Sequence, residues 1–144
     1  MGGFMIAIAL EKHNLHLRIA LNLIKITGTS GNGIILGFML ATAMLSMWIS
    51  NTAAVILLLP VAMSVIAAVE NAIGTNGQTR RFALALLLGL AYAASIGGMG
   101  TLIGTPPNAL FAALARDLLG MEVSFGRWML LGLPLSLVSL LVVW

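Results

Sequence analysis

Residues 96–108, IGGMGTLIGTPPN, interrupt a long apolar run. Four glycines and two adjacent prolines cannot continue a regular helix. Helical sequence precedes this break over residues 82–96 and resumes over residues 109–118. The two arms together have about the length of one tilted membrane span with an unwound centre. The pattern is typical of the discontinuous helices that line substrate sites in membrane carriers.

A second polar break, Ser50-Asn51-Thr52, lies upstream between apolar runs at residues 34–49 and 53–69. Each run holds 16 or 17 residues, which is at the lower edge of what crosses a hydrocarbon core of ~30 Å. Two full spans would leave only these three residues for the turn at the far surface. A re-entrant hairpin would instead place the polar tip at membrane depth, buried in protein or beside a water-filled cavity. We favour the re-entrant hairpin.

The composition is that of a membrane protein. Of 144 residues, 60% are apolar and only 8% are charged, whereas a soluble domain carries about 25% charged residues. No charged residue or histidine occurs within residues 26–69, 82–115 or 128–144. Runs of this length reach the ~18 residues that indicate a membrane span. We therefore predict an all-α, multi-pass protein of the cell (inner) membrane, in contact with the lipid bilayer.

Basic residues indicate the orientation. Five of them fall on the same side of the predicted spans, which the positive-inside bias makes cytoplasmic. These five are Lys12, Arg18, Lys25, Arg80 and Arg81. The charges within residues 116–127 sum to zero, as expected of an external loop.

Several classes of function are excluded. The net charge of +3 comes from scattered loop residues, so we expect no nucleic-acid partner. Cysteine is absent, and His13 and His16 lie in a polar loop where nothing completes a metal site. No His, Asp, Glu or Cys lies at membrane depth to act as base or nucleophile, so we predict that the chain is not an enzyme.

The chain divides into five segments. Residues 1–10 are too short to span a membrane and suit the end of a preceding span, and residues 11–32 suit an interfacial helix and turn. Residues 33–70 form the predicted hairpin, residues 81–118 the broken span, and residues 127–144 the start of the next span. Because both ends are apolar, we expect an internal piece of a longer protein.

The two breaks bring helix ends together. Carbonyl groups are unpaired where the first arms end, near Ser50 and Gly97, and with Ser and Asn oxygens they suit a hard monovalent cation. Amide groups begin near Thr52 and after Pro106, where they suit a carboxylate or another oxyanion. No Lys or Arg lies at this depth to neutralise an anion. A bound cation is the natural counter-charge, which favours coupling of anion entry to sodium.

Some hydroxyl groups have simpler explanations. Ser and Thr in membrane helices often donate to a carbonyl of their own helix. Thr42 and Ser64 fit that description, whereas for Ser46 the pattern leaves both interpretations open.

The two breaks, in this order and at this distance, resemble those of the divalent anion/sodium symporter family, which are sodium-coupled dicarboxylate, citrate and sulfate carriers. The resemblance covers nearly the whole chain and implies one inverted-repeat half of a secondary transporter, the first of two. It also implies that the remaining half of the carrier completes the site, and that the full-length protein forms a homodimer.

Site residues follow from the same resemblance. The implied sodium ligands are Ser46, Ser50, Asn51 and Gly104. The implied contacts to a substrate carboxylate are Asn51, Thr52, Thr105 and Pro106. The expected function is therefore sodium-coupled transport of a small divalent anion, such as succinate or sulfate. The alternatives are a carrier of another oxyanion on a related fold, and a membrane fragment that does not transport.

Overall fold

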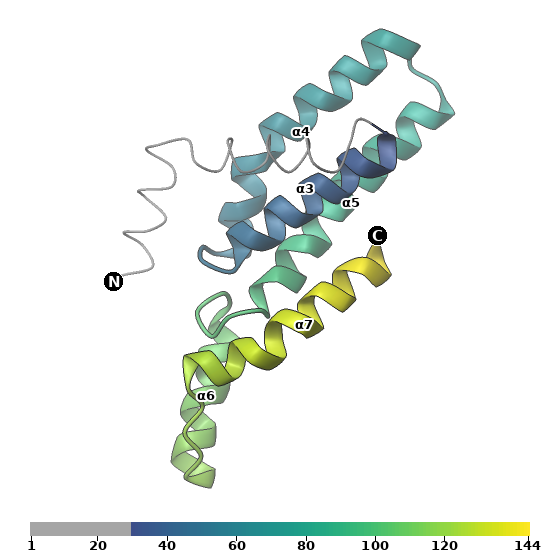
Figure 1. Ribbon diagram of the computed structural model, residues 1–144. Helices are drawn as coiled ribbons and strands as arrows, with labels where there is room; N and C mark the ends of the chain where they lie inside the picture. Colours follow the sequence, from purple (N-terminus) through teal and green to yellow (C-terminus); the bar gives the residue numbers. More distant parts are fainter. Residues whose placement is uncertain (1–29) are drawn as a thin grey trace.

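The computed structural model describes residues 30–144, so the predictions for residues 1–10 and for the interfacial helix that begins at residue 11 lie outside the described residues. The described part is all-helical and contains no strand, which confirms the predicted all-α class. Its helices are α3 (Gly31–Ser46), α4 (Asn51–Ile73), α5 (Gly77–Gly98), α6 (Pro106–Leu119) and α7 (Phe125–Val143) (Figure 1).

Polar side chains set where most of these helices begin. Ser30, Ser50 and Ser124 precede α3, α4 and α7, and each side chain accepts a hydrogen bond from a first-turn amide. Asn76 caps α5 in the same way, so α5 begins five residues before the apolar run at residue 82 and places Arg80 in its first turn. α6 differs, because two prolines open it and the Thr105 side chain caps none of its amides.

α3, α4 and α5 pack together as a bundle. α3 and α4 run antiparallel as a hairpin, and α5 packs against both, most extensively against α3 (Figure 1). Large apolar side chains fill the space between them, including the fully buried Phe38, Leu58 and Leu86. At Gly97 there is no room for a side chain, because the backbone of Ala43 in α3 lies directly against it. The end of α5 is therefore held close to the end of α3.

α7 returns along the other side of the break. Ser136 Oγ in α7 donates to the carbonyl of Ile96, and Trp128 Nε1 donates to the carbonyl of Met99, each at 3.0 Å. Trp128 also packs against Phe111 of α6, with ring centroids 5.9 Å apart. These contacts brace the C-terminal end of α5, where the Ile96 carbonyl also accepts from the amide of Met99 at 3.2 Å.

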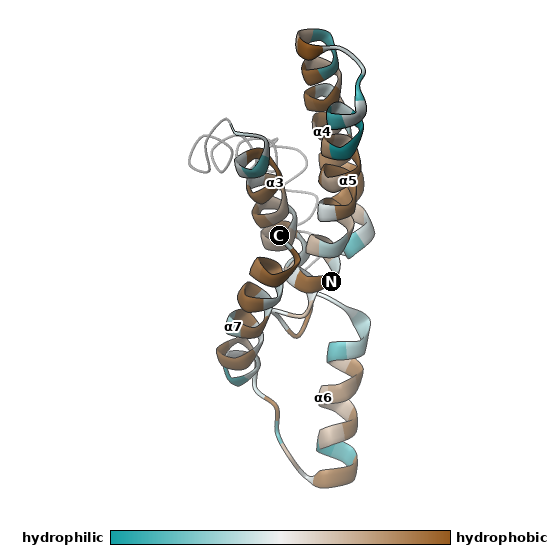
Figure 2. Ribbon diagram, turned by 90° about the vertical axis from the view of Figure 1, so that its right-hand side faces the viewer, coloured by the Kyte–Doolittle hydropathy of each residue, from teal (hydrophilic) through white to brown (hydrophobic). Residues whose placement is uncertain are grey.

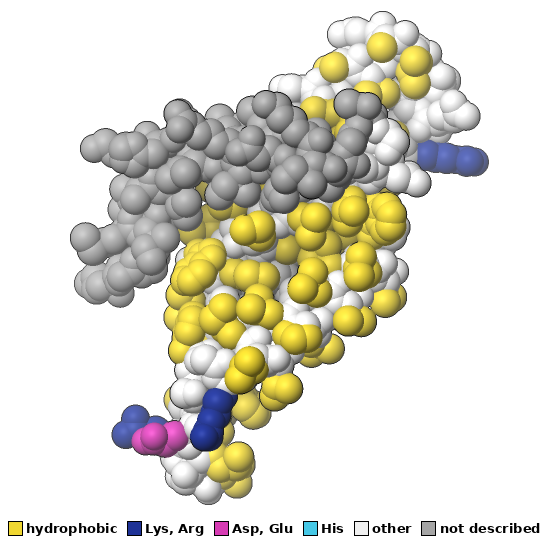
Figure 3. Space-filling model, in the orientation of Figure 1, with side chains coloured by type: hydrophobic (Ala, Val, Ile, Leu, Met, Phe, Trp, Pro, Cys, Tyr) yellow, Lys and Arg dark blue, Asp and Glu magenta, His cyan; other side chains and the backbone are white. Residues whose placement is uncertain are grey.

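The charge and hydropathy of the helices agree with a multi-pass membrane protein. Of the described helices, α4, α5 and α7 are long and apolar enough to cross a membrane, whereas α3 has 16 residues. Hydrophilic residues gather where α4 turns into α5 (Figure 2). On the visible face, charged side chains lie towards the two ends, with hydrophobic side chains between them (Figure 3).

Re-entry of the α3–α4 hairpin stays a prediction, because helix length does not distinguish it from two full spans. α4 has 23 residues and is longer than the expected run at residues 53–69, because it begins at Asn51 and continues through Pro60 to Ile73. Its length alone would allow it to cross a membrane. The hairpin tip nevertheless lies beside the break between α5 and α6, and α6 continues beyond it (Figure 1).

Candidate functional site

The hairpin tip and the break between α5 and α6 meet at Gly98. A methyl group added to Gly98 would lie 2.6 Å from Asn51 Oδ1 and 2.6 Å from Thr105 Cγ2. Asn51 is the first residue of α4, and Thr105 immediately precedes α6. Asn51 and Thr105 thus both lie against Gly98 at the end of α5. They come from two breaks that are about fifty positions apart in the sequence.

An oxygen-rich cluster lies at the tip. Ser46 Oγ is 2.6 Å from Asn51 Oδ1 and 2.6 Å from the carbonyl oxygen of Ala94 in α5. A serine hydroxyl has a single hydrogen, so with the amide in this orientation it can donate to only one of these two acceptors at a time. Three neutral oxygens from three helices therefore converge with one proton among them. Hard cations prefer such oxygen ligands.

The hydroxyl groups with simpler explanations behave as expected. Thr42 donates to the carbonyl of Phe38 at 2.7 Å, and Ser64 donates to the carbonyl of Pro60 at 2.9 Å, both within their own helices. Ser46 instead reaches across to α4 and α5, although it is fully buried like Thr42. The geometry thus separates Ser46 from the ordinary helix hydroxyls.

The other residues expected to bind sodium lie around this cluster. Ser50 is exposed, and its hydroxyl accepts from the amide of Ala53, which caps α4. Gly104 is buried and packs directly against the backbone of Gly98, so a side chain at Gly104 would collide with the end of α5. The backbone of the break at Gly104 is therefore close to Gly98, the same residue against which Asn51 lies.

The two helix starts are not equivalent. The first amides of α4, those of Asn51 and Thr52, have no acceptor within the helix, and Thr52 is exposed. At α6, Pro106 and Pro107 have no N–H group, and the amide of Asn108 donates to the Thr105 carbonyl at 3.2 Å. For an anion, α4 therefore offers free backbone donors, whereas α6 offers chiefly the half-buried Thr105 hydroxyl.

A shallow groove of about 300 Å³ runs from the tip along α4 and α5. Its polar lining comes from Asn51, Thr52 and Ser95, while Thr105 and Pro106 do not line it. Ser95 and the Ala94 carbonyl were not predicted from the sequence. Neither carried a signal, because one is an ordinary helix serine by pattern and the other is a backbone atom.

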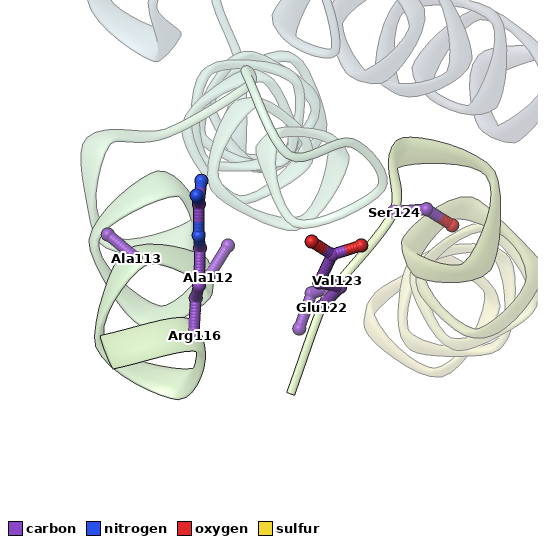
Figure 4. Close-up of a pocket in the computed structure, with 6 residues that line it drawn as sticks. All are labelled: Ala112, Ala113, Arg116, Glu122, Val123 and Ser124. Carbon is purple, nitrogen blue, oxygen red and sulfur yellow. The ribbon is translucent and has the colours of Figure 1, made fainter. Parts of the chain in front are cut away.

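A second depression, of about 320 Å³, lies at the far end of α6. Arg116 of α6 and Glu122 of the following loop both line it (Figure 4). None of the predicted site residues lines it. Across residues 30–144, no group of three His, Cys, Asp or Glu side chains could hold a metal ion.

Comparison with known proteins gives a consistent family. A family model described as citrate transporter matches residues 1–144, the whole chain. The sodium-dependent dicarboxylate transporter SdcS of Staphylococcus saprophyticus is 44% identical over 149 residues. The protein of the same name from Staphylococcus aureus strain USA300 is 44% identical over 147 residues.

Each of these matches covers 100% of this chain but 28% of the relative, so the chain spans little more than a quarter of the relatives' length. A family of transporters agrees with the prediction that the chain is not an enzyme. The chain belongs to the citrate transporter family, in agreement with its resemblance to the divalent anion/sodium symporters.

Proposed function

We propose that this chain supplies one half of the binding site of a carrier that moves a small dicarboxylate across the membrane together with sodium. The observation that carries the proposal is the meeting of Asn51 and Thr105 over Gly98. Relatives named sodium-dependent dicarboxylate transporters support both the substrate class and the coupling ion. Sulfate remains the alternative anion, because hydroxyl and amide donors bind either group.

Sodium binds at the tip in this proposal. Ser46 and Asn51 supply side-chain oxygens that already lie 2.6 Å apart, while Ser50 and the Gly104 backbone complete the set from either side. The single hydroxyl hydrogen of Ser46 can be donated to only one of two acceptor oxygens. A cation bound there would interact favourably with both. It also supplies positive charge at a place where the described helices have no Lys or Arg.

The anion binds beside the sodium ion. One carboxylate accepts hydrogen bonds from the start of α4 at Asn51 and Thr52, and from the Thr105 hydroxyl, with Pro106 lining the contact. Helix dipoles contribute only on the order of 1 kcal/mol each, so the sodium ion is the main counter-charge. The second carboxylate is held by the remaining half of the carrier.

Re-entry of α3 and α4 belongs to the same proposal. The tip lies beside the break rather than at the end of α6 (Figure 1), so a membrane that contains α5 and α6 also surrounds the tip. The polar tip is then shielded by α5 on one side and by the carrier's aqueous cavity on the other.

Uptake of labelled succinate by the full-length carrier in proteoliposomes tests the function. We expect uptake in an inward sodium gradient, loss of uptake when choline replaces sodium, and competition by unlabelled dicarboxylates. Succinate uptake that is the same without sodium would overturn the coupling. Sodium-driven uptake of sulfate with no uptake of succinate would replace the substrate.

A further inference from the structure

The hairpin tip and the break are joined by a hydrogen bond from a buried threonine side chain. Thr101 Oγ1, in the loop between α5 and α6, donates to the carbonyl oxygen of Met47 at 2.6 Å. Met47 caps the C-terminal end of α3, directly after Ser46, and a carbonyl at that position has no partner within the helix. The Thr101 side chain is fully buried, so water does not substitute for it. Thr101 therefore supplies the partner that the end of α3 lacks.

Asn108 extends this connection to α6. Its side-chain amide donates to the Gly98 carbonyl at 2.9 Å and to the Thr101 carbonyl at 2.8 Å. Both amide hydrogens are therefore used, one on the end of α5 and one on the loop. Because Asn108 lies in the first turn of α6, it fixes the start of that helix relative to Thr101.

Side-chain packing follows the same route. A methyl group added to Gly100 would lie 3.1 Å from Met47 Cε, so the Met47 side chain covers the backbone of the loop. Moving the tip away from the loop would break this contact and leave the hydroxyl of Thr101, which is fully buried, without its acceptor. An unsatisfied buried polar group is costly, so we expect the tip and the loop to move together.

We infer that Thr101 is a positioning residue that couples the sodium half-site at the tip to the anion half-site at the start of α6. The coupling runs from Met47 through Thr101 to Asn108, three positions beyond Thr105. Sodium held by Ser46 and Asn51 sets the position of the end of α3, and Thr101 transmits that position to α6. The inference rests on the proposed function, and it assigns Thr101 no contact with either ligand.

Thr101→Val in the full-length carrier tests this coupling, because it removes the hydroxyl and keeps the shape. Thr42→Val is the matched control: Thr42 is equally buried and also donates to a carbonyl, that of Phe38, but within α3. Uptake is measured per carrier in the membrane, as the half-saturating sodium concentration and as the succinate KM at low and at saturating sodium.

For Thr101→Val we expect the half-saturating sodium concentration to rise roughly five- to tenfold, as for loss of one hydrogen bond. The succinate KM should rise at low sodium and return to within about twofold of wild type at saturating sodium, because the two ligands are linked. Thr42→Val should change neither quantity, and Thr101→Ser should restore wild-type behaviour.

Equal effects of Thr101→Val and Thr42→Val would overturn the inference. So would a succinate KM that rises by the same factor at every sodium concentration, since that is a local defect without coupling. If Thr101→Val does not reach the membrane, Thr101→Cys replaces it, and its weaker donor should give an intermediate sodium shift; a wild-type response from Thr101→Cys would count against the inference. Failure of the proposed function is recognised separately, because wild-type uptake would then not depend on sodium.

Discussion

Ser46 illustrates what single residues contribute to this site. Its hydroxyl lies 2.6 Å from two acceptors, Asn51 Oδ1 and the Ala94 carbonyl. Asn51 could be identified from the sequence, because it lies in a polar break between apolar runs. The Ala94 carbonyl could not, because it is 48 positions from Ser46 and no residue type marks it. The sequence could thus identify candidate side chains of the site. The backbone atoms that join them could be identified only from the way the helices pack.

The first prediction concerns Asn51. In the full-length carrier, Asn51→Ala removes an oxygen from the proposed sodium site, and we take the contribution of that oxygen as comparable to a hydrogen bond to a charged group, roughly 1.5–3 kcal/mol. We expect the half-saturating sodium concentration for succinate uptake to rise about ten- to a hundredfold. Asn71→Ala, at an exposed position near the end of α4, is the matched control and should leave it unchanged. An unaltered sodium response in Asn51→Ala would remove Asn51 from the site.

At the scale of elements, the sequence predicts where helices break better than where they end. Glycine and proline made the break after α5 visible, and the polar tip marked the turn between α3 and α4. The extension of α4 to Ile73 was missed, because Glu70 and Asn71 look like loop residues although they continue the helix up to Gly74. The close approach of Gly97 and Gly98 to α3 and α4 also remained hidden. It depends on how three helices pack, and glycine by itself does not say which backbone it meets.

The second prediction concerns the approach of the elements at Gly98. Gly98→Ala places a methyl group 2.6 Å from Asn51 Oδ1 and 2.6 Å from Thr105 Cγ2, and overpacking of this kind typically costs about 1–3 kcal/mol. We expect the binding free energies of succinate and sodium to weaken by more than the free energy of unfolding falls. The reason is that the added methyl group pushes the two site residues apart.

Gly126→Ala provides the control for this change. Nothing lies within 4 Å of a methyl group added at Gly126 in α7, so uptake and thermal stability should both be retained. Normal uptake by Gly98→Ala would show that Asn51 and Thr105 do not need their present separation for transport.

At the scale of the whole molecule, charge and hydropathy indicate how the helices sit in the membrane. Arg80 and Arg81 lie near the start of α5, whereas Arg116, Asp117, Glu122 and Arg127 lie in and around α6 and α7. On the face shown in Figure 3, charged side chains lie towards the two ends of the molecule. The sequence predicted this separation because charged residues are confined to the loops. Whether α4 re-enters or crosses does not follow from its 23 residues, since either path accommodates that length.

The third prediction is topological. Single cysteines replacing Asn32 and Asn71 in a full-length carrier free of other cysteines should react with a membrane-impermeant thiol reagent only from the cytoplasmic side. A cysteine replacing Met121, which is exposed between α6 and α7, should react only from outside. If a cysteine at Asn51 reacted freely from outside in every conformation, α3 and α4 would be two full spans.

The central claim is that the tip and the break form one site, and a double-mutant cycle on Asn51 and Thr105 tests it most directly. Succinate affinity of Asn51→Ala, Thr105→Val and the double variant is measured by isothermal titration of the purified full-length carrier at one saturating sodium concentration. Residues that share a ligand typically couple by about 0.5–3 kcal/mol, so we expect the loss in the double variant to differ from the sum of the single losses by that amount. Strictly additive losses, or no loss from Thr105→Val, would contradict a single site built from both breaks.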